Sequence, residues 1–137
     1  MSVIVIIVDD DEGVRFFHRI IVSQSELCAE PLSFGYGEEL LEYLDKNSDE
    51  ADNFLILLDI NMPGMNGWDI MDAISDKSYH SRVHIVVVTS SVDWVEHEKA
   101  RSYSMVIDIL EKPISDAACK RIMNYPSIAQ YFSQVKK

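Results

Sequence analysis

Acidic, hydroxyl and lysine side chains stand directly after apolar runs that have the length of a β-strand. An acidic pair, Asp9 and Asp10, follows the first such run, while Asp59, Thr89 and Lys112 stand at or just beyond the ends of three later ones. In parallel sheets the carboxyl ends of buried strands meet at one edge, and ligands bind there. The chemistry available to this set is that of three carboxylates, one hydroxyl and one ammonium group.

The three carboxylates would repel one another in a shared cleft unless a cation lies between them. Magnesium suits such a cleft, because it takes one or two carboxylates together with retained waters and a phosphate oxygen. Lys112 adds a second cation, and the hydroxyl of Thr89 can donate to a phosphoryl oxygen. Asp59 is then left as a carboxylate nucleophile that can form an acyl phosphate. The residues therefore predict a phosphoryl-accepting aspartate.

Each of these residues also has a structural interpretation when taken alone. Asp9 to Asp11 fit an acidic strand-to-helix turn, because carboxylates are favoured at helix N-termini. Asp59 can begin a loop, Thr89 can cap a helix, and Lys112 before a proline is a weak signal by itself. Their occurrence at successive strand ends, in this order, is far more specific and favours the phosphoryl-acceptor hypothesis.

The elements that would position these residues alternate along the chain. Strands are predicted over Val3 to Val8, Ala29 to Phe34, Leu55 to Asp59, Val83 to Thr89 and Val106 to Leu110. Helices are predicted near Val14 to Ile21, over Gly37 to Asp45, over Trp68 to Ser75, from Ser90 to about Tyr103, and from Ser115. This alternation indicates an α/β fold with a parallel sheet and helices on both faces.

The polar interruptions predict the strand order. Pro31 interrupts the second run and Asp108 the fifth, which favours edge positions for both, whereas the other three runs are solidly apolar. The sequence therefore predicts a doubly wound five-stranded sheet in the order 2-1-3-4-5. The helix after the fourth strand should begin with a capping box in Ser90-Ser91-Val92-Asp93, and Val14, Phe17 and Ile21 recur at the spacing of the first helix.

The composition of the 137 residues limits the partners and the compartment. The net charge of −11 argues against a nucleic acid or an anionic membrane, since both require a basic surface. Cys28 and Cys119 have no zinc-site spacing and are expected to be buried thiols in a reducing compartment. The N-terminal apolar run meets Asp9 too early for a signal peptide or a membrane span, so a cytoplasmic location is expected.

The C-terminal segment departs from the regular alternation. Pro126 interrupts the last helix, because a proline inside a helix removes a hydrogen bond and clashes with the preceding turn. We therefore divide the chain into a domain over 1–125 and a helical extension over 126–137 that packs on the domain or continues its last helix. The extension keeps an apolar stripe, and a dimer seam or partner-docking helix is the less favoured interpretation of its residues Ile128, Tyr131, Phe132 and Val135.

With these motifs in place, residues 3 to 123 resemble the receiver domain of two-component response regulators, the CheY-like family with a flavodoxin-like fold. The resemblance lies in the acidic pair, "LLDINMPGMNG", "VVVTSS" and "EKP". It implies that a sensor histidine kinase or a histidine phosphotransfer protein phosphorylates Asp59. It also implies that Asp10, Asp59 and the backbone carbonyl of Asn61 hold Mg²⁺, with Asp9 acting through a water.

The resemblance further implies how the phosphoryl group is sensed. Lys112 would pair with it, Thr89 would bond it and shift, and Pro113 would follow Lys112 through a cis peptide bond. Ile109 stands where the family often carries a switching aromatic residue, so the output surface is expected to be read differently. Trp94 is a candidate contact on that surface, with a half-buried packing role as the alternative.

The leading function hypothesis is a stand-alone receiver that docks an unidentified downstream protein or passes its phosphoryl group along a relay. It is not expected to be an enzyme beyond its own phosphotransfer and slow autodephosphorylation. The sequence leaves open whether phosphorylation drives homodimerisation. One alternative is a small phosphatase of the haloacid-dehalogenase type using Asp9, although Gly13 stands where its motif has threonine or valine. The other is a phosphorylation-independent binding domain.

The histidines offer weaker signals. His80 and His84 are four residues apart, a metal-ligand spacing on a helix, but they fall at a loop-to-strand junction. His18 and His97 lie on predicted helices without a second ligand nearby. We therefore expect ordinary surface and strand histidines.

Overall fold

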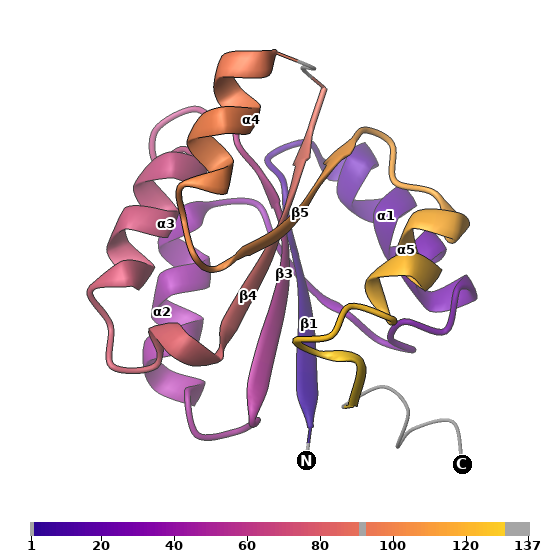
Figure 1. The fold of residues 1–137 in the computed structure, drawn as a ribbon, viewed down its shortest axis with the longest axis horizontal. Coiled ribbons are helices and arrows are strands. Elements are labelled where there is room, and N and C mark those ends of the chain that lie inside the picture. The colour runs from indigo at the N-terminus through magenta and orange to yellow at the C-terminus, as the bar shows by residue number, and fades with distance from the viewer. Residues whose placement is uncertain (1, 91–92, 131–137) are drawn as a thin grey trace.

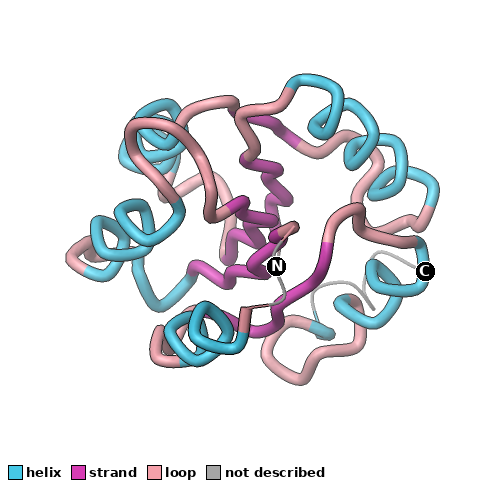
Figure 2. The backbone as a smooth tube through the Cα atoms, turned by 90° about the horizontal axis from the view of Figure 1, so that it is seen from above, coloured by secondary structure: helices cyan, strands magenta, loops and turns pink. Residues whose placement is uncertain are grey.

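The computed structural model describes residues 2–90 and 93–130. Its centre is a sheet of five parallel strands, with helices on both faces (Figures 1 and 2). The strands are β1 (Val3–Val8), β2 (Leu32–Phe34), β3 (Asn53–Asp59), β4 (Val83–Thr89) and β5 (Val106–Glu111). The helices are α1 (Glu12–Gln24), α2 (Gly37–Asn47), α3 (Gly67–Ser75), the 3-10 helix η1 (His80–Arg82), α4 (Trp94–Arg101) and α5 (Asp116–Ile122).

The strand order β2-β1-β3-β4-β5 confirms the predicted topology. Every residue of β3 is buried, as expected of a central strand in a parallel sheet. β2 is shorter than predicted and begins only at Leu32, after Pro31. Proline has no N–H to donate to a ladder, so the strand starts beyond it. β5 forms the opposite edge, with a register irregularity against β4 at Ile85 and Val86.

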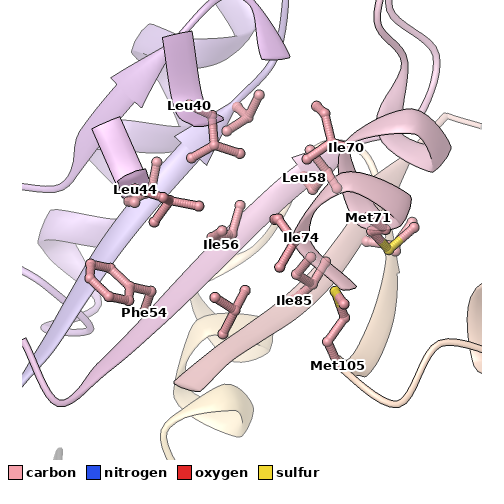
Figure 3. Close-up of a cluster of buried hydrophobic side chains, with 14 of the residues drawn as sticks. Leu40, Leu44, Phe54, Ile56, Leu58, Ile70, Met71, Ile74, Ile85 and Met105 are labelled. Carbon is pink, nitrogen blue, oxygen red and sulfur yellow. The ribbon is translucent and has the colours of Figure 1, made fainter. Parts of the chain in front are cut away.

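Alternate strand residues build two cores, one on each face of the sheet. In Figure 3, Leu40, Leu44 and Ile74 from α2 and α3 pack over Ile56 and its neighbours on one face. On the other face, α1 and α5 cover a second cluster that includes Val5, Ile7, Leu55, Leu57 and Cys119. Figure 1 shows this division, with α2, α3 and α4 to the left of the sheet and α1 and α5 to its right. The two cores fix the carboxyl edge of the sheet from both sides.

The inner face of α1 differs from the predicted stripe at one position. Phe17 is 44% exposed, whereas His18 and Val22 are buried. Neighbouring helical positions are about 100° apart, so counting His18 as a polar surface residue displaced the stripe by one residue. Val14 and Ile21, the other two predicted positions, are half-buried.

α4 begins later than predicted. Its N-cap is Asp93, whose side chain accepts a hydrogen bond from the backbone N–H of Val95 at 2.9 Å, and the helix runs only from Trp94 to Arg101. The prediction from Ser90 to Tyr103 was too long at both ends. Ser91 and Val92, part of the predicted capping box, lie outside the described residues.

The C-terminal segment is described only to residue 130. α5 ends at Ile122, before Pro126 is reached, and Pro126 itself lies in a turn. Ile128 is fully buried in the cluster under α1 and α5, and packing of the whole segment 126–137 on the domain stays a prediction. The remaining stripe residues, Tyr131, Phe132 and Val135, lie outside the described residues.

Both cysteines are free thiols, as predicted. Cys119 is buried and Cys28 is half-buried. Burial raises the pKa of both thiols and keeps them protonated. None of the helices in the described part of the chain has the length and apolarity needed to cross a bilayer.

Candidate functional site

The carboxyl ends of β1, β3, β4 and β5 meet at one edge of the sheet. The strands are in register there, with Val8 paired to Leu58 and Thr89 paired to Glu111. Asp9 follows β1 directly, and Asp59 is the last residue of β3. Both carboxylate residues are almost fully buried, at 2% and 3% exposure, and Thr89 is buried beside them at the end of β4.

Asp59 is held by the loop between β3 and α3. The backbone N–H groups of Met62 and Gly67 donate to the carbonyl of Ile60 at 3.1 and 3.0 Å, which folds the loop back onto the strand. The N–H of Asn61 donates to Oδ1 of Asp59 at 3.2 Å. A Cβ on Gly67 would lie 2.9 Å from the carbonyl oxygen of Asp59, so only glycine allows α3 to begin this close to the strand.

Asp9 is held by the turn into α1. Its Oδ1 accepts the N–H of Asp11 at 2.9 Å, and Asp11 in turn caps α1 by accepting the N–H of Val14 at 3.0 Å. The guanidinium of Arg15 donates to the backbone carbonyl of Asp9 at 2.7 Å. These bonds leave Oδ2 of Asp9 facing the cleft.

Lys112 joins the two buried carboxylates. Its Nζ lies 2.7 Å from Oδ2 of Asp9 and 3.2 Å from Oδ2 of Asp59. Its backbone N–H donates to the carbonyl of Thr89 at 2.9 Å, which fixes the start of the segment after β5. The following peptide bond, Lys112–Pro113, is cis, as the resemblance implied.

The charges in this cleft are not balanced. Burial raises the pKa of Asp59 to about 6, and the charge of Asp9 adds to this, against the opposing effects of Lys112 and of the N–H of Asn61. Burial lowers the pKa of Lys112, but the hydrogen bond that Lys112 donates to Asp9 and the charges of both carboxylates outweigh this, so the pKa lies above its ordinary value. One ammonium group therefore leaves the carboxylates with an excess of negative charge.

The carboxylates form a set that fits a divalent cation. Asp9, Asp10 and Asp59 each offer an oxygen atom, and these atoms lie within 4.8 Å of one another. Asp10 is exposed, so the cluster opens to solvent on that side. Hard oxygen donors, an open side and uncompensated negative charge are what Mg²⁺ requires when it keeps part of its water shell.

The structure thus brings together Asp9, Asp10, Asp59 and Lys112, with Thr89 at the adjoining strand end. The two residues predicted for the output surface, Ile109 and Trp94, lie elsewhere. Ile109 is half-buried on β5, beside Val87, and packs against the core on the α2 and α3 side. Trp94 is 71% exposed at the start of α4. The half-buried packing role considered for Trp94 was therefore wrong, and its role as a contact stays a prediction.

Two residues near the site were missed. Arg15 contacts Asp9 through a backbone carbonyl, and no pattern of residue types signals such a contact. His18 is 2% exposed on α1, and its Nε2 lies 3.3 Å from the backbone N–H of Ile114. The spacing of four between His18 and the buried Val22 was the available signal for its burial.

A five-stranded 2-1-3-4-5 sheet with an acidic cluster and a lysine at its carboxyl edge defines the class of α/β receiver domains. A family model described as "Response regulator receiver domain" matches residues 5–124. The chain belongs to this family.

The relatives agree with this assignment. The nitrate/nitrite response regulator protein NarL of Escherichia coli K12 is 32% identical over 89 residues, which cover 63% of this chain and 38% of NarL. An uncharacterized response regulatory protein of Staphylococcus epidermidis is 32% identical over 88 residues, covering 64% of this chain and 32% of that protein. The chain therefore matches less than two fifths of the length of these curated relatives.

Solved structures show the same fold over nearly the whole chain. A two-component response regulator from Cytophaga hutchinsonii has a TM-score of 0.80 at 25% identity, covering 90% of this chain and 95% of that one. A CheY-like receiver domain protein from Methanospirillum hungatei has a TM-score of 0.65 at 27% identity, covering 99% and 98%. These neighbours share the parallel α/β architecture on which the site is built.

Proposed function

We propose that Asp59 accepts a phosphoryl group from the histidine of a sensor histidine kinase or a histidine phosphotransfer protein, in a Mg²⁺-dependent reaction. The phosphorylated chain then changes its binding to a downstream protein. Receiver domains of response regulators work with kinases and downstream targets in general, and this chain belongs to that family. The observation that carries the proposal is the burial of Asp59 against Asp9 and Lys112 at the carboxyl edge of the sheet.

The proposed reaction is a displacement at phosphorus. One oxygen of the Asp59 carboxylate forms a bond to phosphorus while the bond from phosphorus to the donor imidazole breaks, and the departing nitrogen keeps the electron pair. The product is an acyl phosphate on Asp59. A water that later attacks phosphorus releases inorganic phosphate and restores the carboxylate, which is the slow autodephosphorylation expected of the site. The transfer ends on the chain itself, so no separate substrate is turned over.

The residues of the cleft have distinct proposed tasks. The N–H of Asn61 donates to Oδ1 of Asp59 and holds that carboxylate in one orientation. Lys112 supplies a positive charge within 3.2 Å of the other oxygen, where negative charge from a phosphoryl group would add. The hydroxyl of Thr89 is proposed to donate to a phosphoryl oxygen and to move toward it.

Mg²⁺ is the proposed cofactor. When bound, it neutralises charge on the phosphoryl oxygens. Asp10 and Asp59 would hold it with the carbonyl of Asn61, and Asp9 would act through a water. The three carboxylate oxygens within 4.8 Å of one another support this assignment.

The output is proposed to lie on the face that carries Ile109 and Trp94. An isoleucine cannot make the swing of an aromatic ring, so a shift of Thr89 would be felt through repacking of the aliphatic side chain on β5. The exposed indole of Trp94 offers a large apolar contact for a partner protein.

The test is phosphorylation by a small donor. Incubation with acetyl phosphate and Mg²⁺, followed by intact mass measurement, should show one added phosphoryl group. The adduct should be absent in Asp59→Asn and in the presence of EDTA, and present in Asp76→Asn, a matched control at an exposed aspartate after α3. Absence of an adduct in the wild type at saturating donor, or its persistence in Asp59→Asn, would contradict the proposal.

The same experiment tests the phosphatase hypothesis. Asp9 is held more closely than Asp59: its Oδ1 accepts the N–H of Asp11 at 2.9 Å and its Oδ2 lies 2.7 Å from Nζ of Lys112, whereas the corresponding contacts of Asp59 are both 3.2 Å. We therefore expect no turnover of a phosphate ester such as p-nitrophenyl phosphate. Turnover that disappears in Asp9→Asn would favour the haloacid-dehalogenase-type alternative instead.

A further inference from the structure

His18 is a buried histidine that the proposed reaction does not use. It lies on α1 with 2% of its surface exposed, between the sheet and the segment that follows β5. Its Nε2 is 3.3 Å from the backbone N–H of Ile114, a residue 96 positions away in the chain. Burying a polar side chain is costly unless its hydrogen bond has a structural or functional role.

The direction of this hydrogen bond fixes the state of the ring. A backbone N–H can only donate, so Nε2 of His18 must accept and the ring proton lies on Nδ1. Burial lowers the pKa of His18, the charge of Asp9 opposes this, and the charge of Lys112 adds to it. The ring is therefore neutral at pH 7, the form that can accept from Ile114.

The hydrogen bond to His18 is one of two that hold the backbone on either side of Lys112. Lys112 is tied at its backbone N–H to the carbonyl of Thr89 at 2.9 Å. Pro113 has no N–H, so Ile114 offers the next backbone donor along the chain. Nε2 of His18 accepts a hydrogen bond from the N–H of Ile114, and Ile114 itself is buried. The backbone on both sides of Lys112 is thus held, one side by β4 and the other by α1.

The position of Lys112 depends on this segment. Its Nζ must stay close to Asp9 and Asp59, at 2.7 and 3.2 Å, while an open hollow of about 400 Å³ lies beside it, lined by His18, Phe17 and Pro113 among others. A displaced backbone could let the flexible lysine side chain turn into this hollow. Misplacement of a catalytic group by about 1 Å can reduce a rate by roughly 100-fold.

We propose that His18 is a positioning residue for phosphoryl transfer, which holds the Lys112–Ile114 segment through the N–H of Ile114 and so keeps Lys112 against the phosphoacceptor. This inference rests on the proposed function of Asp59. It adds a residue of α1 that touches neither the phosphoryl group nor the metal.

The test compares variants of His18 by their rate of phosphorylation with acetyl phosphate. His18→Leu removes the acceptor at similar volume and should lower the rate roughly tenfold. His18→Gln places an amide oxygen near the position of Nε2 and should restore the rate to within about threefold of the wild type. Val22→Ala, one turn further along the buried face of α1, should lower stability without changing the rate. If His18→Leu does not fold, His18→Phe replaces it, since its ring also lacks an acceptor.

A double-mutant cycle with Lys112→Ala separates positioning from general destabilisation. If His18 acts through Lys112, His18→Leu should cause no further loss of rate in the Lys112→Ala background. Faster hydrogen exchange at the amide of Ile114 in His18→Leu, but not in Val22→Ala, should accompany the effect.

Any of three results would contradict the role of His18 and leave the proposed function intact. They are a wild-type rate in His18→Leu, an equal loss of rate in Val22→Ala, and an undiminished effect of His18→Leu in the Lys112→Ala background. A wild-type protein that takes up no phosphoryl group would instead contradict the proposed function, and the inference with it. The wild-type control therefore tells the two failures apart.

Discussion

Polar side chains at the amino ends of the strands differ in their pairing from those at the carboxyl ends, and these two sides of the sheet are called its two edges here. Where the strands begin, three polar side chains have well-matched partners: Tyr79 donates to Asp45 at 2.8 Å, His84 contacts Asn53 at 2.8 Å, and Arg82 donates to two backbone carbonyls. At the edge where the strands end, two carboxylates are buried against a single lysine, and a third lies nearby.

The difference separates stability from function. Polar groups with complete partners strengthen the fold, whereas buried charge without full compensation lowers stability and is typical of functional sites. The raised pKa of Asp59 and the lowered pKa of Asp45 express this contrast in two carboxylates of one domain.

The largest effect is expected from Gly67→Ala, which disturbs the backbone that carries Asp59. The added Cβ would lie 2.8 Å from Cα of Ile60 and 2.9 Å from the carbonyl oxygen of Asp59. Chemical denaturation should show a loss of about 3 kcal/mol, with slower phosphorylation of the folded fraction. Gly13→Ala is the control, because its Cβ would meet only a side-chain oxygen of Asp11 at 3.3 Å and should be nearly neutral.

Asp59→Asn should change stability in the opposite direction. At pH 7 without Mg²⁺, it removes a buried charge that faces Asp9, and the free energy of unfolding should rise by about 2 kcal/mol. Mg²⁺ should then stabilise the wild type more than the variant, because binding to the folded state adds stability by mass action. A variant less stable than the wild type in EDTA would show that the charges at this edge are already balanced.

Arg82→Ala probes the balanced edge. Nη1 of Arg82 donates to the carbonyls of Ser48 and Ala51 at 2.6 and 3.1 Å, so its loss should cost about 2 kcal/mol and leave the phosphorylation rate of the folded protein unchanged. Lys46→Ala is the control: its ion pair with Glu42 is 70% and 68% exposed, and its loss should cost less than about 0.5 kcal/mol. A phosphorylation rate that falls with Arg82→Ala would show that the two edges are coupled.

The smallest effect is expected in the pH dependence of stability. Burial lowers the pKa of His84 in the folded state. The contribution of His84 to the free energy of unfolding is therefore complete above its ordinary pKa of 6.5, and it is lost as the pH falls from there toward the pKa in the folded state. The hydrogen bonds from Tyr79 and then Lys77 lower the pKa of Asp45, whose contribution is complete above 3.8 and is lost further into acid. Between pH 7 and pH 5, the free energy of unfolding measured by chemical denaturation should fall less in His84→Gln than in the wild type. Glutamine keeps a donor for Asn53 and cannot titrate. An equal loss in both proteins would contradict the assignment to His84.

The topology and the core of the site could be predicted from the sequence because both depend on short-range patterns. Apolar runs mark the strands, and Pro31 and Asp108 mark the edges. A parallel sheet then brings Asp9, Asp59 and Thr89 to one side, however far apart they lie in the chain.

What the sequence could not supply are contacts between side chains and distant backbone. His18 looks like a surface residue until the N–H of Ile114 is placed beside it, and Arg15 contacts a carbonyl that every residue type carries. The start of α4 was misplaced for a related reason: serine and aspartate can both cap a helix, and Asp93 has that role here.

The measurement that tests the account most directly is the location of the phosphoryl group within the chain. After phosphorylation with acetyl phosphate and Mg²⁺, borohydride reduction converts an aspartyl phosphate to homoserine, which peptide mass spectrometry assigns to one position. The account predicts homoserine at position 59 and unmodified aspartate at Asp9 and Asp10. Homoserine at Asp9 or Asp10, or at no position despite saturating donor, would contradict it.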